Sequence, residues 1–362
     1  MNGCRQPDSG SEKKNMKKDI CAYTYEQLGT EVQALGEPKF RAGQIYEWLH
    51  TKLVEDFSEM RNVPKNLQER LKESYAILPV TMIERQESRI DGTVKFLFGL
   101  HDGNMVESVL MPYRHGNSVC ISSQAGCRMG CRFCASGIGG LSRNLSASEM
   151  LGQVYQIQKI TKERVSNVVV MGTGEPLDNY QNLLIFLKIL SGEHGLQISQ
   201  RSITVSTCGI VPKIYELARE HLQITLAISL HAATQEKRRK LMPVADAYGL
   251  EELLKACDSY FQETGRRLTF EYSLIRGVND TEKDIRDLVS ILQSRNCHLN
   301  LIPVNSVKER NFTRPDSKNA QNFKNKLEKS GINVTIRREM GADIDGACGQ
   351  LRRRYIESSK TL

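Results

Sequence analysis

The chain has 362 residues, 40% of them hydrophobic and 25% charged, and its 50 Lys and Arg residues outnumber 42 Asp and Glu residues. This composition supports a buried core and excludes a chain that is disordered throughout. No segment reaches the ~18 consecutive apolar residues that span a bilayer, and the polar start lacks the apolar core of a secretory signal, so we expect a cytoplasmic protein that does not enter a membrane. The net charge of +8 modestly favours a polyanionic partner such as nucleic acid.

Ten cysteines are too many to ignore in a chain of this length. Their uneven spacing, in a protein expected to be cytoplasmic, argues against a framework of disulfides. A metal site or a redox site is the better interpretation.

The first part of the chain divides into a polar tail and a helical module. Residues 1–20 are rich in Lys and Ser and are expected to form a mobile tail. Residues 21–80 follow a helical pattern and are expected to form an accessory domain. The apolar residues of one helical face are Ile45, Trp48, Leu49 and Leu53.

Residues 81–116 change to a period of two, which predicts a short β-meander that links the helical module to the rest of the chain. The apolar members of the alternation are Val94, Phe96, Phe98 and Leu100. Alternation alone also predicts that Glu107, further along the meander, faces solvent.

From residue 117 to residue 345, short β-rich segments alternate with longer amphipathic segments, which predicts an α/β fold with a parallel sheet. The expected strands are 118–122, 167–171, 202–206, 224–229, 268–274 and 299–303, with a further strand at 332–337. Six units are too few for a closed eight-stranded barrel, and either an open barrel or a doubly wound sheet fits the pattern. Residues 346–362 are expected to form a loop and a basic C-terminal tail.

Polar residues gather directly after the expected strands. They are the segments 127–134 and 172–175 and the residues Thr207, His231 and Asn305. Because the carboxyl ends of parallel strands carry the site in such sheets, the sequence predicts one pocket. Taken alone, His231 is more typical of a satisfied core histidine, and a Gly-x-Gly segment is more typical of a simple turn.

Three cysteines, Cys127, Cys131 and Cys134, stand within eight residues directly after the first expected strand of the α/β region. Chance is a poor explanation of that spacing. Structural zinc normally takes four ligands, and no His or fourth Cys stands nearby in sequence. An iron–sulfur cluster held by three thiolates instead leaves one iron open to a substrate or cofactor. A cluster is therefore favoured, with zinc and unliganded thiols as the alternatives.

The CxxxCxxC spacing, with Phe133 before the last cysteine, resembles the signature of radical S-adenosylmethionine (SAM) enzymes. The segment Gly172-Thr-Gly-Glu-Pro176 is similar to the turn that receives the amino group of SAM in that superfamily. The resemblance implies a 4Fe-4S cluster on the three cysteines. It also implies reductive cleavage of SAM to a 5'-deoxyadenosyl radical within a partial (βα)6 barrel of the TIM type.

Further segments resemble the dual-specificity RNA (adenine-C2) methyltransferases, the RlmN family. They are 120–127, 172–176, 206–207, 229–231, 239–243, 277–280, 300–303 with Asn305, and 343–351. The resemblance implies methylation of C2 of one adenosine in the peptidyl transferase centre of 23S rRNA and of adenosine 37 in tRNAs. The sister family that methylates C8 of the same ribosomal adenosine, and confers antibiotic resistance, is the alternative; the segment 264–272 favours the C2 group.

The chemistry explains why such an enzyme needs a radical and a further thiol. C2 of adenine is too electron-poor to attack the methyl group of SAM, whereas a thiolate attacks it readily. The resemblance implies that Cys348 accepts a methyl group from a first SAM and that a second SAM supplies the radical, so that two are used per turnover. The methylene then joins the base in a covalent protein–RNA adduct, which Cys120 resolves by forming a disulfide with Cys348. Glu107 matches the proton acceptor.

The resemblance also implies a set of SAM contacts. They are Gly174, Glu175, Ser206, Ser229, Leu230, His231 and Asn305. Cys208 and the other remaining cysteines match no role and are read as ordinary thiols.

The expected partners are 23S rRNA, tRNA and an electron donor such as flavodoxin or ferredoxin. The basic segments 237–240, 337–338 and 352–354 could follow an RNA backbone, although a charge run is by default a solvated face. The target base must leave its stack to reach a pocket at the barrel mouth. A non-enzymatic iron–sulfur or zinc RNA-binding protein is the rival reading, but it leaves Gly174, Glu175 and Cys348 without a task.

Overall fold

The computed structural model describes residues 17–304, 312–344 and 349–359. By its internal contacts the chain divides into two compact units, Met1–Leu78 and Pro79–Leu362. The finer boundaries expected from the sequence, at residues 20, 80, 116 and 345, stay predictions. Among the described residues, no helix is both long and apolar enough to cross a membrane.

The first unit is a helical module closed by one small pair of parallel strands. Thr24 begins its first α-helix with a capping box, in which the Thr24 hydroxyl accepts from the Gln27 amide and the Gln27 side chain accepts from the Thr24 amide. The predicted apolar face is buried at Ile45, Leu49 and Leu53. The elements are β1 (Lys18–Asp19), η1 (Ile20–Ala22), α1 (Tyr25–Ala34), α2 (Phe40–His50), η2 (Phe57–Glu59), α3 (Lys65–Ser74) and β2 (Tyr75–Ala76).

The second unit is built on a ten-stranded sheet in the order β14-β13-β12-β11-β10-β9-β6-β5-β4-β3. Strands β3 to β6 form an antiparallel meander, and β6 and β9 to β14 pair in parallel. The strands are β3 (Thr81–Glu87), β4 (Val94–Gly99), β5 (Met105–Tyr113), β6 (Gly116–Ile121), β9 (Val165–Val170), β10 (Ile203–Thr207), β11 (Thr225–Ser229), β12 (Leu268–Leu274), β13 (Cys297–Pro303) and β14 (Val334–Ile336).

The strand order decides between the two architectures that the sequence left open. Each parallel strand from β9 onward is added on the same side of the one before it, so the sheet winds in one direction and stays open, as a partial barrel. A doubly wound sheet would reverse its order near the middle. The α/β fold class and the partial barrel are confirmed.

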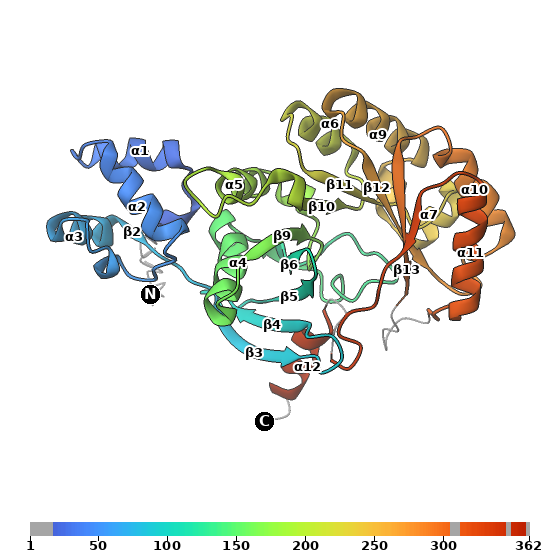
Figure 1. The fold of residues 1–362 in the computed structure, drawn as a ribbon, viewed down its shortest axis with the longest axis horizontal. Coiled ribbons are helices and arrows are strands. Elements are labelled where there is room, and N and C mark those ends of the chain that lie inside the picture. The colour runs from blue at the N-terminus through green and yellow to red at the C-terminus, as the bar shows by residue number, and fades with distance from the viewer. Residues whose placement is uncertain (1–16, 305–311, 345–348, 360–362) are drawn as a thin grey trace, which may run out of the picture. The chain divides into compact units, whose positions relative to one another are not determined.

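Helices cover the outer side of the curved sheet, where α5, α6, α9, α10 and α11 lie along it (Figure 1). One helix, α12, occupies a region where we expected a basic tail. The helical elements are α4 (Ala147–Thr161), η3 (Pro176–Asn179), α5 (Tyr180–Ser191), η4 (Gln200–Ser202), α6 (Val211–Arg219), α7 (Gln235–Leu241), α8 (Val244–Ala247), α9 (Leu250–Thr264), α10 (Glu282–Leu292), α11 (Ser317–Lys329) and α12 (Gln350–Ser359).

The meander is buried on both faces at β4 and β5, which the alternating pattern did not predict. Phe96 and Phe98 are fully buried on one face of β4, and Lys95 is fully buried on the other. The Lys95 ammonium lies 3.0 Å from the carboxylate of Glu107, which is only 4% exposed. The expectation from alternation that Glu107 faces solvent is therefore wrong, because a cation on the neighbouring strand accompanies its carboxylate into the interior.

A small hairpin carries the three closely spaced cysteines. Its strands are β7 (Gln124–Gly126) and β8 (Leu141–Asn144), and residues 127–140 connect them. Gly126 has a φ of +84°, and a Cβ atom there would collide with the carbonyl oxygen of Gly140. The loop therefore begins at a position that only glycine can occupy.

We predict that Gly126→Ala destabilises the second unit more than Gly103→Ala does. Both glycines have φ near +80°, so both substitutions incur the about 1–2 kcal/mol that the left-handed region costs an L-residue. Only at Gly126 does the new methyl group also meet backbone, since nothing lies within 4 Å of a Cβ at Gly103. Calorimetry of the two variants checks this, and equal unfolding temperatures would contradict it.

Candidate functional site

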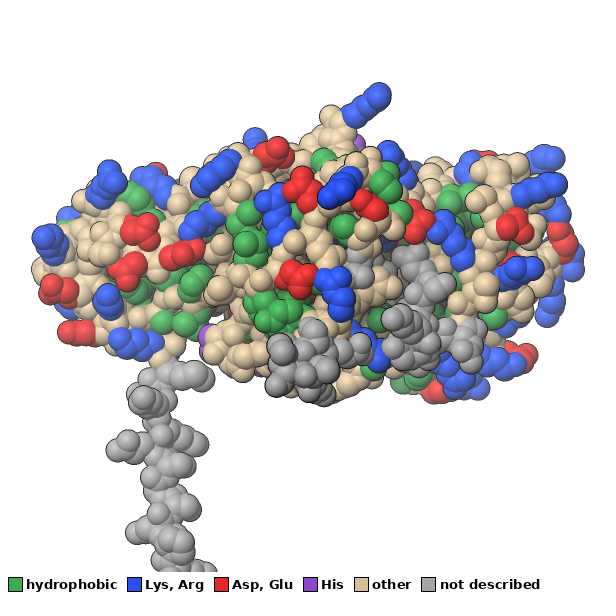
Figure 2. All heavy atoms as spheres, turned by 90° about the horizontal axis from the view of Figure 1, so that it is seen from below, with side chains coloured by type: hydrophobic (Ala, Val, Ile, Leu, Met, Phe, Trp, Pro, Cys, Tyr) green, Lys and Arg blue, Asp and Glu red, His purple; other side chains and the backbone are tan. Residues whose placement is uncertain are grey.

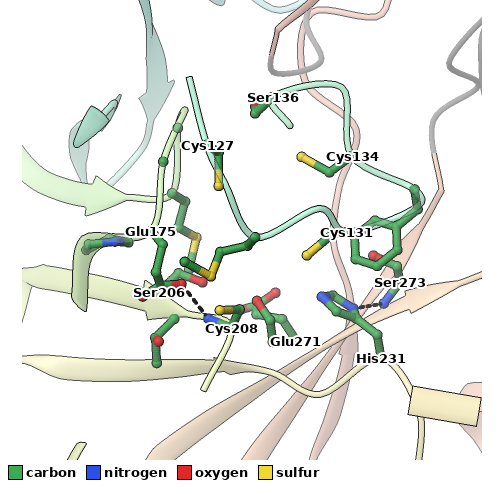
Figure 3. Close-up of a pocket in the computed structure, with 18 of the residues that line it drawn as sticks. Cys127, Cys131, Cys134, Ser136, Glu175, Ser206, Cys208, His231, Glu271 and Ser273 are labelled. Atoms are coloured by element: carbon green, nitrogen blue, oxygen red, sulfur yellow. Dashed lines mark hydrogen bonds between the residues drawn. The ribbon is translucent and has the colours of Figure 1, made fainter. Parts of the chain in front are cut away.

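The three loop cysteines line one pocket at the carboxyl ends of the parallel strands. Figure 3 shows their thiols pointing toward a common space, with side chains from the strand ends on the opposite side. Backbone hydrogen bonds hold the loop, from Cys127 to the Gly140 carbonyl at 3.0 Å and from Arg132 to the Leu241 carbonyl at 2.9 Å. In the described part of the chain, no three His, Cys, Asp or Glu side chains are arranged to hold a single metal ion.

The thiols fit a cationic cluster by their chemistry. Burial, followed by the charge of the neighbouring thiol Cys134, raises the pKa of Cys127 to about 11. Burial, followed by the charges of Cys134 and Cys127, raises the pKa of Cys131 as well. Thiols of this kind lose their protons when they bind a metal, because the cation offsets both burial and mutual repulsion. The loop can therefore supply three ligands to an iron–sulfur cluster.

The Gly-Thr-Gly-Glu turn after β9 is pressed against the end of β6. A Cβ at Gly172 would lie 2.7 Å from the Ile121 carbonyl oxygen, and one at Gly174, where φ is +114°, would lie 2.7 Å from the Gln124 Cβ. The carbonyl between them, that of Thr173, accepts hydrogen bonds from the amides of Ser123 and Gln124. Both glycines are thus required by close backbone approach.

Glu175 ends this turn with a fully formed set of hydrogen bonds. Its carboxylate accepts from the amides of Leu177 at 3.0 Å and of Cys208 at 2.7 Å. Burial nevertheless raises the pKa of Glu175, since its effect outweighs the hydrogen bonds that act in the opposite direction. The carboxylate lines the pocket and can accept from an amino group placed there.

Ser206, Ser229 and His231 bring the ends of two neighbouring strands, β10 and β11, to the same pocket. His231 has a φ of +55° and lies in edge-to-face contact with Phe133. The imidazole Nδ1 accepts from the Ser273 amide at 2.8 Å, which assigns the proton of the neutral ring to Nε2. Burial, followed by the charge of Arg238, lowers the pKa of His231 to about 3. The ring is therefore a neutral donor at the pocket wall.

Two of the expected SAM contacts are not among the described residues that line the pocket. Leu230 is fully buried and is not among the residues that line the pocket; its amide donates to the Glu271 carbonyl at 3.0 Å. Asn305 lies outside the described residues.

Thr207, expected at the pocket from its place after a strand, lines it. The sequence analysis did not assign four other lining residues to the pocket. They are Cys208, Glu271, Ser273 and Arg337. The available signal was their position, because each stands at or near the carboxyl end of a parallel strand. Burial raises the pKa of the Cys208 thiol, with the charge of Glu175 as the next cause, so Cys208 lines the pocket as a neutral thiol.

Glu107 and Cys120 do not line this pocket. The Glu107 carboxylate accepts from the amides of Gly349 at 2.6 Å and of Arg352 at 2.7 Å, and so caps the beginning of α12. Cys348 itself lies outside the described residues, but Gly349, the next residue, packs against Ala135 in the cysteine loop. Glu107 therefore holds the chain beside the loop that carries the three thiols.

Cys120 is buried on β6 opposite Val109 of β5 and packs with Val109 and Met111. A short hydrogen-bond chain joins this strand pair to the glycine turn. The Ser122 hydroxyl donates to the Glu107 carbonyl at 2.7 Å and accepts from the Thr173 amide at 3.0 Å. The Ser122 hydroxyl thus joins the backbone of Glu107 to the glycine turn at the pocket.

Two family models match this chain. Residues 121–289 match the radical SAM superfamily, and residues 18–77 match the ribosomal RNA large subunit methyltransferase N-terminal domain. The first match spans the cysteine loop and the strands from β9 to β12.

Relatives cover nearly the whole chain. A probable dual-specificity RNA methyltransferase RlmN from Lachnoclostridium phytofermentans is 60% identical over 95% of this chain and 96% of that protein. A protein of the same description from Clostridium botulinum is 54% identical over 95% of this chain and 99% of its own length. The crystal structure of a radical SAM methyltransferase from Sphaerobacter thermophilus superposes with a TM-score of 0.88, at 40% identity, over 92% of this chain and 98% of that one. Given identity at this level along almost its full length, the chain belongs to the RlmN family of the radical SAM superfamily.

Proposed function

We propose that this chain is a radical SAM methyltransferase that modifies C2 of a specific adenosine in 23S rRNA and of adenosine 37 in tRNAs. The observation that carries the proposal is the pocket in which three loop thiols, the Gly-Thr-Gly-Glu turn and the ends of β10 and β11 face one another (Figure 3). The relatives that match over 94% or more of this chain are described as dual-specificity RNA methyltransferases, which supports RNA as the substrate.

In this proposal Cys127, Cys131 and Cys134 hold a 4Fe-4S cluster, which with bound SAM supplies a carbon radical. Glu175 accepts from the amino group of SAM, because its buried carboxylate stands at the end of the glycine turn and lines the pocket. Ser206, Ser229 and His231 offer hydroxyl and imidazole groups to the rest of the molecule, together with Leu230 and Asn305.

Cys348 is the proposed methyl acceptor, since a thiolate attacks the methyl group of SAM whereas C2 of adenine does not. In the proposed sequence, the radical supplied by a second SAM would take one hydrogen atom from the methyl group on Cys348, forming 5'-deoxyadenosine, and the carbon radical left on Cys348 would add to the base. The contacts of Gly349 support this assignment, because a single peptide bond joins Gly349 to Cys348 and Gly349 packs on the cysteine loop. Cys120 is proposed to release the product: its thiolate would attack the Cys348 sulfur, so that a disulfide forms as the bond from that sulfur to the methylene carbon breaks, and the carbon would leave with the electron pair and take up a proton.

Glu107 is the proposed proton acceptor. It is buried, and its carboxylate lies 3.0 Å from the Lys95 ammonium, which fixes its position within the meander. Its carboxylate also accepts from the Gly349 amide, which keeps the acceptor close to the segment of chain that carries the methyl group. The proton at C2 of the adduct would pass to the Glu107 carboxylate.

RNA binding does not depend on a single basic patch in this proposal. On the face drawn in Figure 2, Lys and Arg side chains are interspersed with Asp and Glu side chains. Part of the expected backbone-following segment 237–240 is unsuited to that role, because Arg238 is fully buried and Lys237 pairs with Asp284 at 2.6 Å. Arg337 is exposed and also lines the pocket, so its charge is available at the pocket as well as to solvent. We also propose a cytoplasmic location and a flavodoxin or ferredoxin as electron donor.

Anaerobically reconstituted protein should carry iron and acid-labile sulfide in the ratio of one 4Fe-4S cluster per chain. Replacing Cys127, Cys131 or Cys134 by Ala should abolish that content, because each removes one of three ligands. Cys257→Ala is the matched control, since Cys257 is a fully buried thiol on α9 that does not line the pocket. Stoichiometric zinc without sulfide in the unmodified protein would contradict the assignment.

Variants of Cys120 and of Cys348 should stop at different steps of the reaction. Cys120→Ala should still carry a methyl group on Cys348 and should accumulate a covalent protein–RNA adduct, because only release is blocked. Cys348→Ala and the double variant should form no adduct, a non-additive outcome typical of residues that act in sequence. Peptide mass mapping and a denaturing gel with labelled RNA provide the readouts. Product release at the normal rate from Cys120→Ala would show that Cys120 is a bystander.

Mass spectrometry of RNA from cells that lack this protein tests the substrate and the position of the methyl group. We expect complete loss of 2-methyladenosine from 23S rRNA and from tRNA, with recovery when the unmodified gene is returned and no recovery with Cys348→Ala. Loss of 8-methyladenosine instead would favour the C8 alternative. Unchanged adenosine methylation in both RNAs would refute the proposed function.

A further inference from the structure

Arg238 is a charged side chain in the interior of the second unit. It lies on α7 within the basic run 237–240, yet it is fully buried and is the largest of the fully buried side chains. Its neighbour Arg239 behaves as a surface residue, with a side chain that is 55% exposed and paired with Asp246 at 3.2 Å. Two successive arginines on one short helix therefore have opposite environments.

The guanidinium of Arg238 is only half satisfied. Its Nη2 donates to the carbonyl of Cys208 at 2.7 Å and to that of Ser229 at 3.3 Å. Its Nε and Nη1 are buried without a hydrogen-bond partner, and among the described residues no carboxylate pairs with it. An unpaired charge in the interior costs several kcal/mol unless an anion accompanies it.

Arg238 is connected to the cysteine loop through Cys208 and through the end of α7. Cys208, whose carbonyl Arg238 holds, lines the pocket together with Cys131 and packs in the same cluster of buried residues. The last residue of α7, Leu241, accepts through its carbonyl from the amide of Arg132, between two of the loop cysteines. In Figure 3 Cys208 lies on the far side of the pocket from the loop, facing the thiol of Cys131.

Electrostatic coupling between these groups agrees with that geometry. Burial lowers the pKa of Arg238, and the groups that oppose this effect are the thiols of Cys208, Cys131 and Cys257. The positive charge of Arg238 in turn lowers the pKa of Cys131, although burial dominates there. The groups whose ionisation would act on Arg238 are therefore sulfur atoms of the pocket and its surroundings.

An iron–sulfur cluster on the loop would provide the missing anion. Three thiolates outweigh the positive charge of an oxidised cluster core, and reduction by one electron adds a further negative charge. A fixed cation in a low-dielectric interior stabilises the more negative state and so raises the reduction potential.

We propose that Arg238 is the electrostatic partner of the cluster, which balances the negative charge of the cluster and makes it easier to reduce. This inference rests on the proposed cluster at Cys127, Cys131 and Cys134. Arg238 acts at a distance, from the position where its guanidinium donates to the Cys208 carbonyl. It is neither a ligand nor a residue that touches the substrate. Arg238 lacks a carboxylate partner among the described residues, and the cluster would complete its charge pairing.

The experiment is a potentiometric titration of the reconstituted full-length protein, followed by electron paramagnetic resonance of the reduced cluster. Arg238→Gln removes the charge and retains an amide donor, whereas Arg238→Lys retains the charge. Arg239→Gln removes an equal charge from the surface of the same helix and is the matched control. Because RNA and turnover are not involved, the readout does not depend on activity.

We expect the midpoint potential of Arg238→Gln to be more negative than that of the unmodified protein. A tenfold change in the reduction equilibrium corresponds to 59 mV for one electron. Arg238→Lys should restore most of the difference, and Arg239→Gln should leave the midpoint unchanged. A purely structural role would alter cluster content or unfolding temperature and leave the midpoint unmoved.

The outcomes separate this inference from the proposed function. If the unmodified protein holds no iron and sulfide, the proposed cluster itself fails. If Arg238→Gln holds a full cluster with the same midpoint as Arg239→Gln, the inference about Arg238 is overturned and the cluster stands. If Arg238→Gln cannot hold a cluster, Arg238→Lys decides: normal iron and sulfide content supports a role of charge, and loss of the cluster in that variant overturns it.

Discussion

The close approach of two backbone segments, the glycine turn after β9 and the end of β6, is the contact on which the site depends. The Thr173 carbonyl accepts from the amides of Ser123 and Gln124, and the absence of a Cβ at Gly172 and Gly174 permits that distance. The same contact fixes the start of the hairpin that carries the cysteine loop and directs Glu175 toward the pocket. Without it, the loop thiols and the carboxylate would belong to two unrelated loops.

Buried charge is the second organising feature, and it is paired differently in the meander and around the pocket. Lys95 and Glu107 form an ion pair between neighbouring strands, and the carboxylate also caps α12. Around the pocket, by contrast, burial raises the pKa of Glu175 and Glu271. Arg238 has no carboxylate partner among the described residues. Such a pocket is suited to a ligand that brings charge with it, since buried charges without full pairing are costly.

Much of the fold followed from the sequence, and the differences have identifiable physical causes. The alternation of strands and helices identified all seven parallel strands within a few residues, because each is a short apolar run and most of them are followed by an amphipathic segment. Period-two reasoning was wrong at Glu107, since it assumes that one face of a meander meets water. Charge reasoning was wrong at Arg238, because a basic run on a short helix includes one position that faces inward. The helix α12 was missed where a tail was expected.

The sequence by itself determined the superfamily and the fold class, through the spacing of Cys127, Cys131 and Cys134, the Gly-Thr-Gly-Glu turn and the order of strands along the chain. Residue type and local spacing are sufficient there, because ligand sets and tight turns involve neighbours in sequence. Only the tertiary structure decided that Cys208 and Glu271 join the same pocket, that Lys95 accompanies Glu107, and that Arg238 lies beneath Cys208. Those relations connect different strands and helices, and long-range packing places them without leaving a periodic signal in the sequence.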